Sequence, residues 1–374
     1  MRGLNLVYGA VGNHEANPVN SFPPQEVHTL ANQSNQYMYD TLAGNWLDWV
    51  GSEAAATAAL RAGAYSVVHP GSNLRIISFN TQFYMKENFW LYTPTMPWDP
   101  NGQFSWLISE LQQAEDARER AYLIGHMPMG SSDSLYDYSS YFDQIVERYD
   151  ATIAALFFGH THRDQWEISY SNYTNQNFRT ATEVSYVAPA LTPTSGNPTF
   201  RVYSIDPVTF GVLDYTVYFA NMSLPSYQAD GPKWEKYYSV KETYGPLLNP
   251  PYTSPTTELV PAFWHNLTEV FETDDSVFQD YYARKQRGYD PVLCTGDCKT
   301  EEICGMRSSQ SQYACLPENN PASVKKRGYG RNGNEHNAGS CPGSVALPVL
   351  RQLGTDFHSL QRVIGRRNEG GGWK

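Results

Sequence analysis

The stretch Ala154-Ala-Leu-Phe-Phe-Gly-His-Thr-His162 joins a short apolar run to a pair of histidines. An uninterrupted apolar run of this length predicts a buried β-strand at 154–158. The glycine that follows lets the backbone turn sharply. A His-x-His spacing on such a turn can point two imidazole rings at two adjacent metal ions, because neutral imidazole is a common metal ligand. The stretch therefore predicts a strand of an α/β sheet that ends in metal ligands.

The same pattern occurs at two earlier positions in the chain. Gly12-Asn13-His14-Glu15 follows an expected strand at 4–11, and Gly125-His126 follows an expected strand at 121–125. Loops at one edge of a sheet bring residues that are distant in sequence together. A single Gly-His pair is more often a histidine satisfied in the core, whereas three such motifs at three strand ends favour one shared site.

The remainder of the first 228 residues alternates apolar runs with helical patterns, which predicts a layered α/β domain. Helices are expected at 104–118 and 141–149. Further strands are expected at 74–80, 166–170, 183–188, 201–205 and 213–219.

Two later parts differ in character from this domain. Residues 229–318 predict a smaller helical subdomain, with helices expected at 234–244, 261–272 and 277–286. Residues 319–374 are basic and rich in glycine and asparagine, which predicts a disordered tail.

Composition excludes several classes of protein. The chain of 374 residues has a formal net charge of −11, which argues against a nucleic-acid binder, because such proteins rely on lysine and arginine to meet phosphates. No apolar run reaches the roughly 18 residues of a membrane-spanning helix, so no transmembrane segment is expected.

Cysteines and glycosylation sequons indicate the compartment. Four clustered cysteines predict either a small disulfide knot or a zinc site. Their spacings fit no common zinc knuckle and no histidine lies among them, so disulfides are favoured. Together with four N-x-S/T sequons, they predict a protein of the secretory pathway. The cysteines are Cys294, Cys298, Cys304 and Cys315, with Cys341 alone in the tail, and the sequons begin at Asn32, Asn172, Asn221 and Asn266.

The three histidine motifs, in this order, resemble those of the calcineurin-like metallophosphoesterases. The longer string Gly12-Asn-His-Glu-Ala-Asn-Pro-Val-Asn-Ser-Phe-Pro-Pro24 is similar to the acid sphingomyelinase branch of that family, as are Lys241-Glu-Thr-Tyr-Gly245 and Trp264-His-Asn-Leu267. The resemblance covers about residues 6–316. It implies a four-layer α/β/β/α sandwich with two zinc ions at one edge, and disulfides that pair Cys294 with Cys298 and Cys304 with Cys315.

Carried over to this chain, the resemblance implies that Asn13, His126 and His160 bind one zinc ion and that His162 binds the other. His14 would lie beside the phosphate and help to protonate the leaving group. The family also has an Asp-x-His and a Gly-Asp motif before these, and the chain starts after them. We therefore expect a fragment of a longer protein, with four of seven metal ligands, at most one zinc ion held well, and impaired activity.

The reaction implied by the resemblance is zinc-dependent hydrolysis of sphingomyelin to ceramide and phosphocholine, at a membrane surface, in a secreted or lysosome- or vacuole-like compartment. Two alternatives remain open. Ala188-Pro-Ala-Leu-Thr-Pro-Thr194 and His162-Arg-Asp164 look more like nucleotide-cleaving relatives of the same family. The second alternative is a secreted binding protein that keeps the fold without catalysis.

Overall fold

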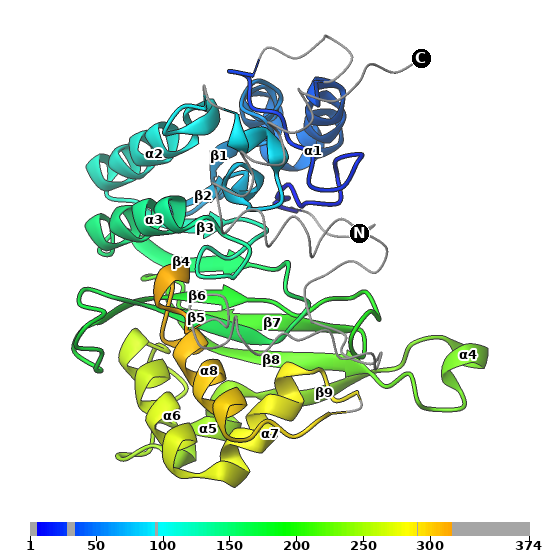
Figure 1. Cartoon of the computed structure of the whole chain (residues 1–374), viewed down its shortest axis with the longest axis vertical. Coiled ribbons are helices and arrows are strands. Elements are labelled where there is room, and N and C mark those ends of the chain that lie inside the picture. The colour runs from blue at the N-terminus through cyan, green and yellow to red at the C-terminus, as the bar shows by residue number, and fades with distance from the viewer. Residues whose placement is uncertain (1–5, 28–33, 94–95, 290, 316–374) are drawn as a thin grey trace, which may run out of the picture.

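The computed structural model describes residues 6–27, 34–93, 96–289 and 291–315. Helices and sheets are stacked in four layers, which confirms the expected α/β/β/α sandwich (Figure 1). One outer layer is formed by α1 (Gln36–Leu60), α2 (Gln103–Ala117) and α3 (Tyr136–Arg148). Short 3-10 helices connect the layers, namely η2 (Thr81–Tyr84), η3 (Phe89–Tyr92), η4 (Pro100–Gly102), η5 (Gly245–Leu247) and η6 (Ser311–Tyr313).

The first sheet positions two of the three histidine motifs. Its strand order is β1 (Tyr65–Val68), β2 (Leu74–Ser78), β3 (Arg120–Ile124), β4 (Ile153–Phe158), β6 (Ala181–Val187) and β5 (Gln165–Tyr170). The four inner strands are parallel, and the two edge strands pair antiparallel to their neighbours. Ile124 lies opposite Phe157, so the residues that follow β3 and β4 leave the sheet at the same edge.

The second sheet and the last helices form the other two layers. The sheet consists of β7 (Thr199–Ile205), β8 (Val212–Ala220) and β9 (Trp234–Ser239). The helices are α4 (Tyr227–Asp230), α5 (Val240–Tyr244), α6 (Pro261–Thr273), α7 (Asp275–Lys285) and α8 (Asp297–Met306). The helix expected at 234–244 is therefore wrong over most of its length, because its first six residues pair with β8 as β9. That pairing continues the second sheet past residue 228, and the division of the chain there stays a prediction.

Two hydrophobic cores lie on opposite faces of the first sheet. One is formed with α1, α2 and α3, and the other is shared with the second sheet and the last helices. In the second core the rings of Trp166 on β5 and Trp264 on α6 have centroids 4.5 Å apart, and both side chains are fully buried. Helix α6 thus packs directly on the first sheet, beyond the area that the narrower second sheet covers (Figure 1).

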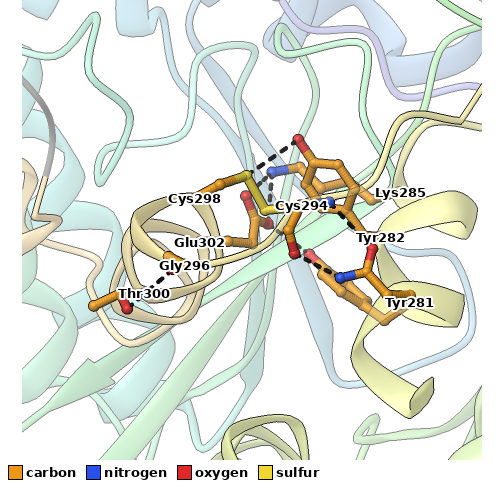
Figure 2. The surroundings of a disulfide bond; sticks show 9 residues. Tyr281, Tyr282, Lys285, Cys294, Gly296, Cys298, Thr300 and Glu302 are labelled. Carbon is orange, nitrogen blue, oxygen red and sulfur yellow. Dashed lines mark hydrogen bonds and ion pairs between the residues drawn. A yellow bond between two sulfur atoms is a disulfide. The ribbon is translucent and has the colours of Figure 1, made fainter. Parts of the chain in front are cut away.

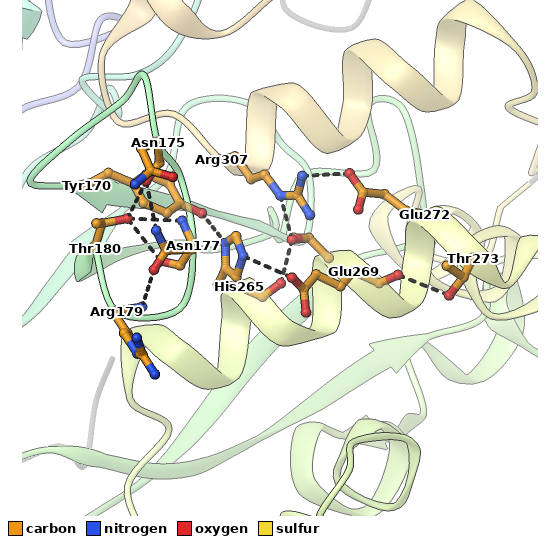
Figure 3. Close-up of polar contacts among 11 residues, drawn as sticks. Tyr170, Asn175, Asn177, Arg179, Thr180, His265, Glu269, Glu272, Thr273 and Arg307 are labelled. Atoms are coloured by element: carbon orange, nitrogen blue, oxygen red, sulfur yellow. Dashed lines mark hydrogen bonds and ion pairs between the residues drawn. The ribbon is translucent and has the colours of Figure 1, made fainter.

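Polar contacts reinforce this packing at the edge strand β5. The hydroxyl of Tyr170 forms a hydrogen bond of 2.8 Å with Nδ1 of His265 on α6, and Nε2 of the same ring lies 3.5 Å from a carboxylate oxygen of Glu269 (Figure 3). Arg307, just after α8, donates to Glu272 at 2.6 Å. His265 is buried, so this histidine is a satisfied core residue rather than a ligand.

The N-terminal motif is held without the strand expected at 4–11. Residues 6–11 have no regular secondary structure, and positions 4 and 5 lie outside the described residues. Side chains take the place of a sheet ladder here, since Tyr65 and Ser78 both donate to the carbonyl of Gly9, at 3.0 and 2.9 Å. Helix α1 and strand β1 were not expected at all.

Both disulfides implied by the resemblance are present. The Cα atoms are 5.3 Å apart in Cys294–Cys298 and 5.7 Å apart in Cys304–Cys315. Helix α8, between the two bridges, is further tied to α7 by Glu302, which accepts from Lys285 at 2.6 Å and from Tyr281 at 3.0 Å (Figure 2). Cys341 and the expected tail at 319–374 lie outside the described residues.

Replacing Cys304 and Cys315 with serine is expected to lower the free energy of unfolding by about 3 kcal/mol, and replacing Cys294 and Cys298 by about 2 kcal/mol. The difference arises because Cys304 and Cys315 are 11 positions apart in the sequence, whereas Cys294 and Cys298 are only 4 apart. The longer loop removes more chain entropy from the unfolded state. Urea unfolding of the two variants, followed by tryptophan fluorescence, measures both losses. A larger loss for the short loop would contradict the entropic argument.

The four sequons differ in their surroundings. Asn172 is exposed in a turn where Thr174 donates to its side-chain oxygen at 2.7 Å. Asn221 is half-buried, and Asn266 lies on α6 next to the buried Thr268. Asn32 lies outside the described residues. Glycosylation at these positions stays a prediction. No helix in the described part of the chain combines the length and the hydropathy needed to cross a bilayer.

Candidate metal centre

Three loops meet at the edge of the first sheet. His126 follows β3, and His160 follows β4. The two loops are joined because the amide of Gly159 donates to the carbonyl of His126 at 2.8 Å. Asn13 reaches the same point from the N-terminal segment, across 113 residues of sequence.

Three side-chain atoms converge there. Nε2 of His126 lies 2.9 Å from Oδ1 of Asn13 and 3.2 Å from Nδ1 of His160. The structure thus brings together three of the four predicted ligands. His162 lies two residues further along the same loop, close enough to His160 and His14 for their charges to lower its pKa. His14 is exposed and is also coupled to His126, so it lies at the solvent side of the same cluster.

The separations of these atoms fit a single metal ion. Two ligand atoms held at about 2.0–2.1 Å from one zinc ion, with angles of about 90–110° between them, lie about 2.9–3.4 Å apart. Within the described residues, no three His, Cys, Asp or Glu side chains form a metal-type group. The third atom of this cluster is instead the amide oxygen of Asn13, which could serve as a neutral ligand.

Burial favours the neutral form of His126 and of His162, which is the form that binds metal ions. Burial lowers the pKa of His126 to about 3, and the neighbouring His160, His14 and His162 lower it further. The pKa of His162 is also lowered, first by burial and then by the positive charge of Arg287. Metal ions bind the deprotonated nitrogen of imidazole, so both shifts favour binding near neutral pH.

The conformational role expected of the motif glycines is wrong. Gly12, Gly125 and Gly159 all avoid the left-handed region, whereas His160 and His162 occupy it, with φ of 71° and 58°. Such backbone in a residue other than glycine is uncommon and concentrates at functional sites. Gly12 is needed for space instead, since a Cβ there would lie 3.0 Å from Nδ1 of His126.

Further polar residues form hydrogen bonds with the donor residues or with their partners. The sequence did not predict these residues as part of the site. Nε2 of His160 lies 2.9 Å from Oδ2 of Asp133, and Nδ2 of Asn13 donates to Asn20 at 3.0 Å. Asn20 in turn donates to Glu87 at 2.7 Å. Asn20 belongs to the quoted string 12–24, which could have marked it. Asp133 and Glu87 lie in loops, where a single sequence does not distinguish an acid that faces the protein from one that faces solvent.

A loop that borders the motif after β4 is pinned by two arginines. Arg287 donates to the carbonyls of Ala190 and Thr192 at 2.7 and 2.9 Å, and also to that of Thr194. Arg163 donates to the carbonyl of Ser195 at 3.2 Å. The loop therefore keeps a fixed position beside the cluster.

Comparisons with known proteins agree with these features. Residues 2–164 match the family described as calcineurin-like phosphoesterase, and residues 174–320 match the acid sphingomyelin phosphodiesterase C-terminal region. The chain is 37% identical over 316 residues to a sphingomyelin phosphodiesterase of Homo sapiens, an alignment that covers 83% of this chain and 47% of that protein. It is 31% identical over 304 residues to sphingomyelin phosphodiesterase 1 of Caenorhabditis elegans, covering 80% and 50%.

The chain is also similar to a relative that is named for a different substrate. The chain is 30% identical over 332 residues to a cyclic GMP-AMP phosphodiesterase of Homo sapiens, covering 83% of this chain and 67% of that protein. The chain spans about half the length of the sphingomyelin phosphodiesterases that it matches.

Proposed function

This chain belongs to the acid sphingomyelinase branch of the calcineurin-like phosphoesterase family, and from that premise we propose that it is a zinc-dependent phosphodiesterase acting on sphingomyelin. The products would be ceramide and phosphocholine. The observation that carries the proposal is that Nε2 of His126 lies within 3.2 Å of ligand-type atoms of both Asn13 and His160, in a chain 37% identical to a sphingomyelin phosphodiesterase.

In this proposal the three converging residues hold one zinc ion, and His162 serves a second. Zinc at such a site polarises a phosphoryl oxygen and lowers the pKa of bound water. The protein supports that chemistry by fixing the donor atoms and by favouring the neutral form of His126 through burial. His14, exposed beside the cluster, would donate a proton to the departing alkoxide, a contribution of roughly 10²–10⁴-fold in rate.

A nucleotide phosphodiester is the second candidate substrate. It is supported by the similarity to a cyclic GMP-AMP phosphodiesterase and by the pinned loop at 190–195, whose sequence resembles the nucleotide-cleaving relatives. For the compartment we propose secretion or a lysosome- or vacuole-like lumen, because two disulfides persist where the environment is oxidising.

The test compares two substrates under one set of conditions. The zinc-supplemented chain is expected to hydrolyse sphingomyelin in detergent micelles faster than a cyclic dinucleotide. Rates are referred to those of the His126→Ala variant, so that slow turnover is distinguished from background. Faster hydrolysis of the dinucleotide would establish the second candidate, and no rate above that variant with either substrate would overturn both.

A further inference from the structure

We propose that Asp133 and Glu87 are positioning residues of the metal centre, which orient two neutral ligands and supply the negative charge that the ligands lack. The inference rests on the proposed zinc site and extends it to residues outside the three histidine motifs. It is carried by two hydrogen-bonded connections that lead away from the donor atoms and end in buried carboxylates.

The first connection runs through His160. Its ring presents Nδ1 to His126 at 3.2 Å, and its opposite nitrogen, Nε2, lies 2.9 Å from the carboxylate of Asp133. The side chains of His160 and Asp133 are only 5% and 9% exposed. A carboxylate can only accept, so this contact holds a ring proton of His160 on Nε2. Nδ1 is thereby left facing His126.

The second connection runs through Asn13. Its amide nitrogen donates to Asn20 at 3.0 Å, which leaves Oδ1 directed at His126, 2.9 Å away. Asn20 donates its own amide nitrogen to Glu87 at 2.7 Å. All three residues are buried. Glu87 therefore fixes which way the amide of Asn13 points, because reversing that amide would break the connection.

The loops that carry the two carboxylates are held together. The amide of Lys86 donates to the carbonyl of Asp133 at 2.8 Å, and Met85 and Ser134 form an isolated antiparallel bridge. Asp133 and Glu87 thus lie on two loops that are hydrogen-bonded to each other beside the centre. Since neither an amide nor an imidazole carries negative charge, a dication there would gain its compensating charge from this outer pair.

The test measures zinc affinity by competition with a chromophoric chelator. Asp133→Asn keeps an acceptor for Nε2 but removes the charge, whereas Asp133→Ala removes both. We expect zinc affinity to fall from wild type to Asp133→Asn to Asp133→Ala, with a loss of about 10–100-fold for the alanine variant. Glu87→Gln, which likewise keeps an acceptor, should weaken zinc binding in the same direction.

A second readout separates positioning from general stability. Selective ¹⁵N-histidine NMR of the metal-free protein should report the Nε2–H tautomer for His160 in the wild type and a loss of that preference in Asp133→Ala. The matched control is Asp143→Asn, a buried carboxylate that accepts from Tyr173 and Gln310. It is expected to leave both zinc affinity and the His160 tautomer unchanged.

Unaltered zinc affinity in both Asp133 variants would overturn this proposal while leaving the metal site intact. An absence of zinc binding in the wild type would instead overturn the proposed function, and this inference with it. If Asp133→Ala does not fold, Asp133→Asn and Glu87→Gln decide the matter.

Discussion

Replacing His126 with alanine is expected to abolish zinc retention and to bring phosphodiesterase activity to background. Nε2 of His126 is the atom that lies within 3.2 Å of both other donors, so its removal leaves Asn13 and His160 without their common neighbour. The loss of zinc affinity should exceed the roughly 10–100-fold that typically follows from the loss of an outer partner. Chelator competition measures the affinity, and hydrolysis of sphingomyelin micelles measures the activity.

The control for this variant is His69→Ala. His69 lies in the turn between β1 and β2, where β2 begins, whereas His126 follows the end of the parallel strand β3. The two histidines are therefore at opposite edges of the sheet. His69 contacts Tyr8 at 2.9 Å and none of the donors, so its loss should leave zinc affinity unchanged. Equal zinc affinity in His126→Ala and wild type would show that the three atoms do not hold the ion.

The elements that could be predicted from the sequence are those whose pattern of apolar residues matches the burial of those residues in the fold. Strands β3 and β4 are short, mostly apolar runs whose residues are buried or half-buried, and α6 begins at a proline with a clear apolar stripe. Helix α1 was missed because glycine interrupts it, and Gly51 takes a non-helical φ of 83° within it. At 234–239 aromatic residues suit either a helix or a strand, and pairing with β8 decides for the strand.

The residues of the candidate site also divide into those that the sequence predicts and those that it does not. Asn13, His126 and His160 were found because each stands in a motif, while Asp133 and Glu87 were not, because only the folded chain brings their loops behind the donors. The motif glycines were found for a partly wrong reason. Gly125 is needed because a Cβ there would lie 2.9 Å from the side chain of Thr81, not because the backbone turns through a left-handed conformation.

Asp164 illustrates how a residue within a motif can serve the fold. Its position two residues after His162 suggested a role in substrate choice, yet its side chain is completely buried. Oδ1 accepts from Nε of Arg201 at 2.9 Å, and Oδ2 accepts from Tyr238 at 2.8 Å. Its backbone amide also donates to the carbonyl of Lys285 at 3.2 Å. The pair of Asp164 and Arg201 thus joins the motif loop to the second sheet.

We expect Asp164→Ala to lower the free energy of unfolding by about 3–5 kcal/mol, because it leaves the guanidinium of Arg201 buried without a counter-charge. Arg201 is 1% exposed in its side chain, so water cannot take over the role of the carboxylate. Urea unfolding followed by tryptophan fluorescence measures the loss. The double variant Asp164→Leu with Arg201→Met should recover most of it, since replacing a buried ion pair by apolar side chains is often nearly neutral.

The exposed ion pair of Arg148 and Glu115 provides the contrast. Their side chains are 58% and 39% exposed, so Glu115→Ala should cost no more than about 1 kcal/mol. Both pairs consist of a guanidinium and a carboxylate, and they differ chiefly in burial. The difference between the losses of unfolding free energy in Asp164→Ala and Glu115→Ala therefore measures the effect of burial on the cost of breaking such a pair. A loss in Asp164→Ala as small as that in Glu115→Ala would mean that Arg201 finds another partner. The expected anchoring of the motif loop through Asp164 would then be wrong.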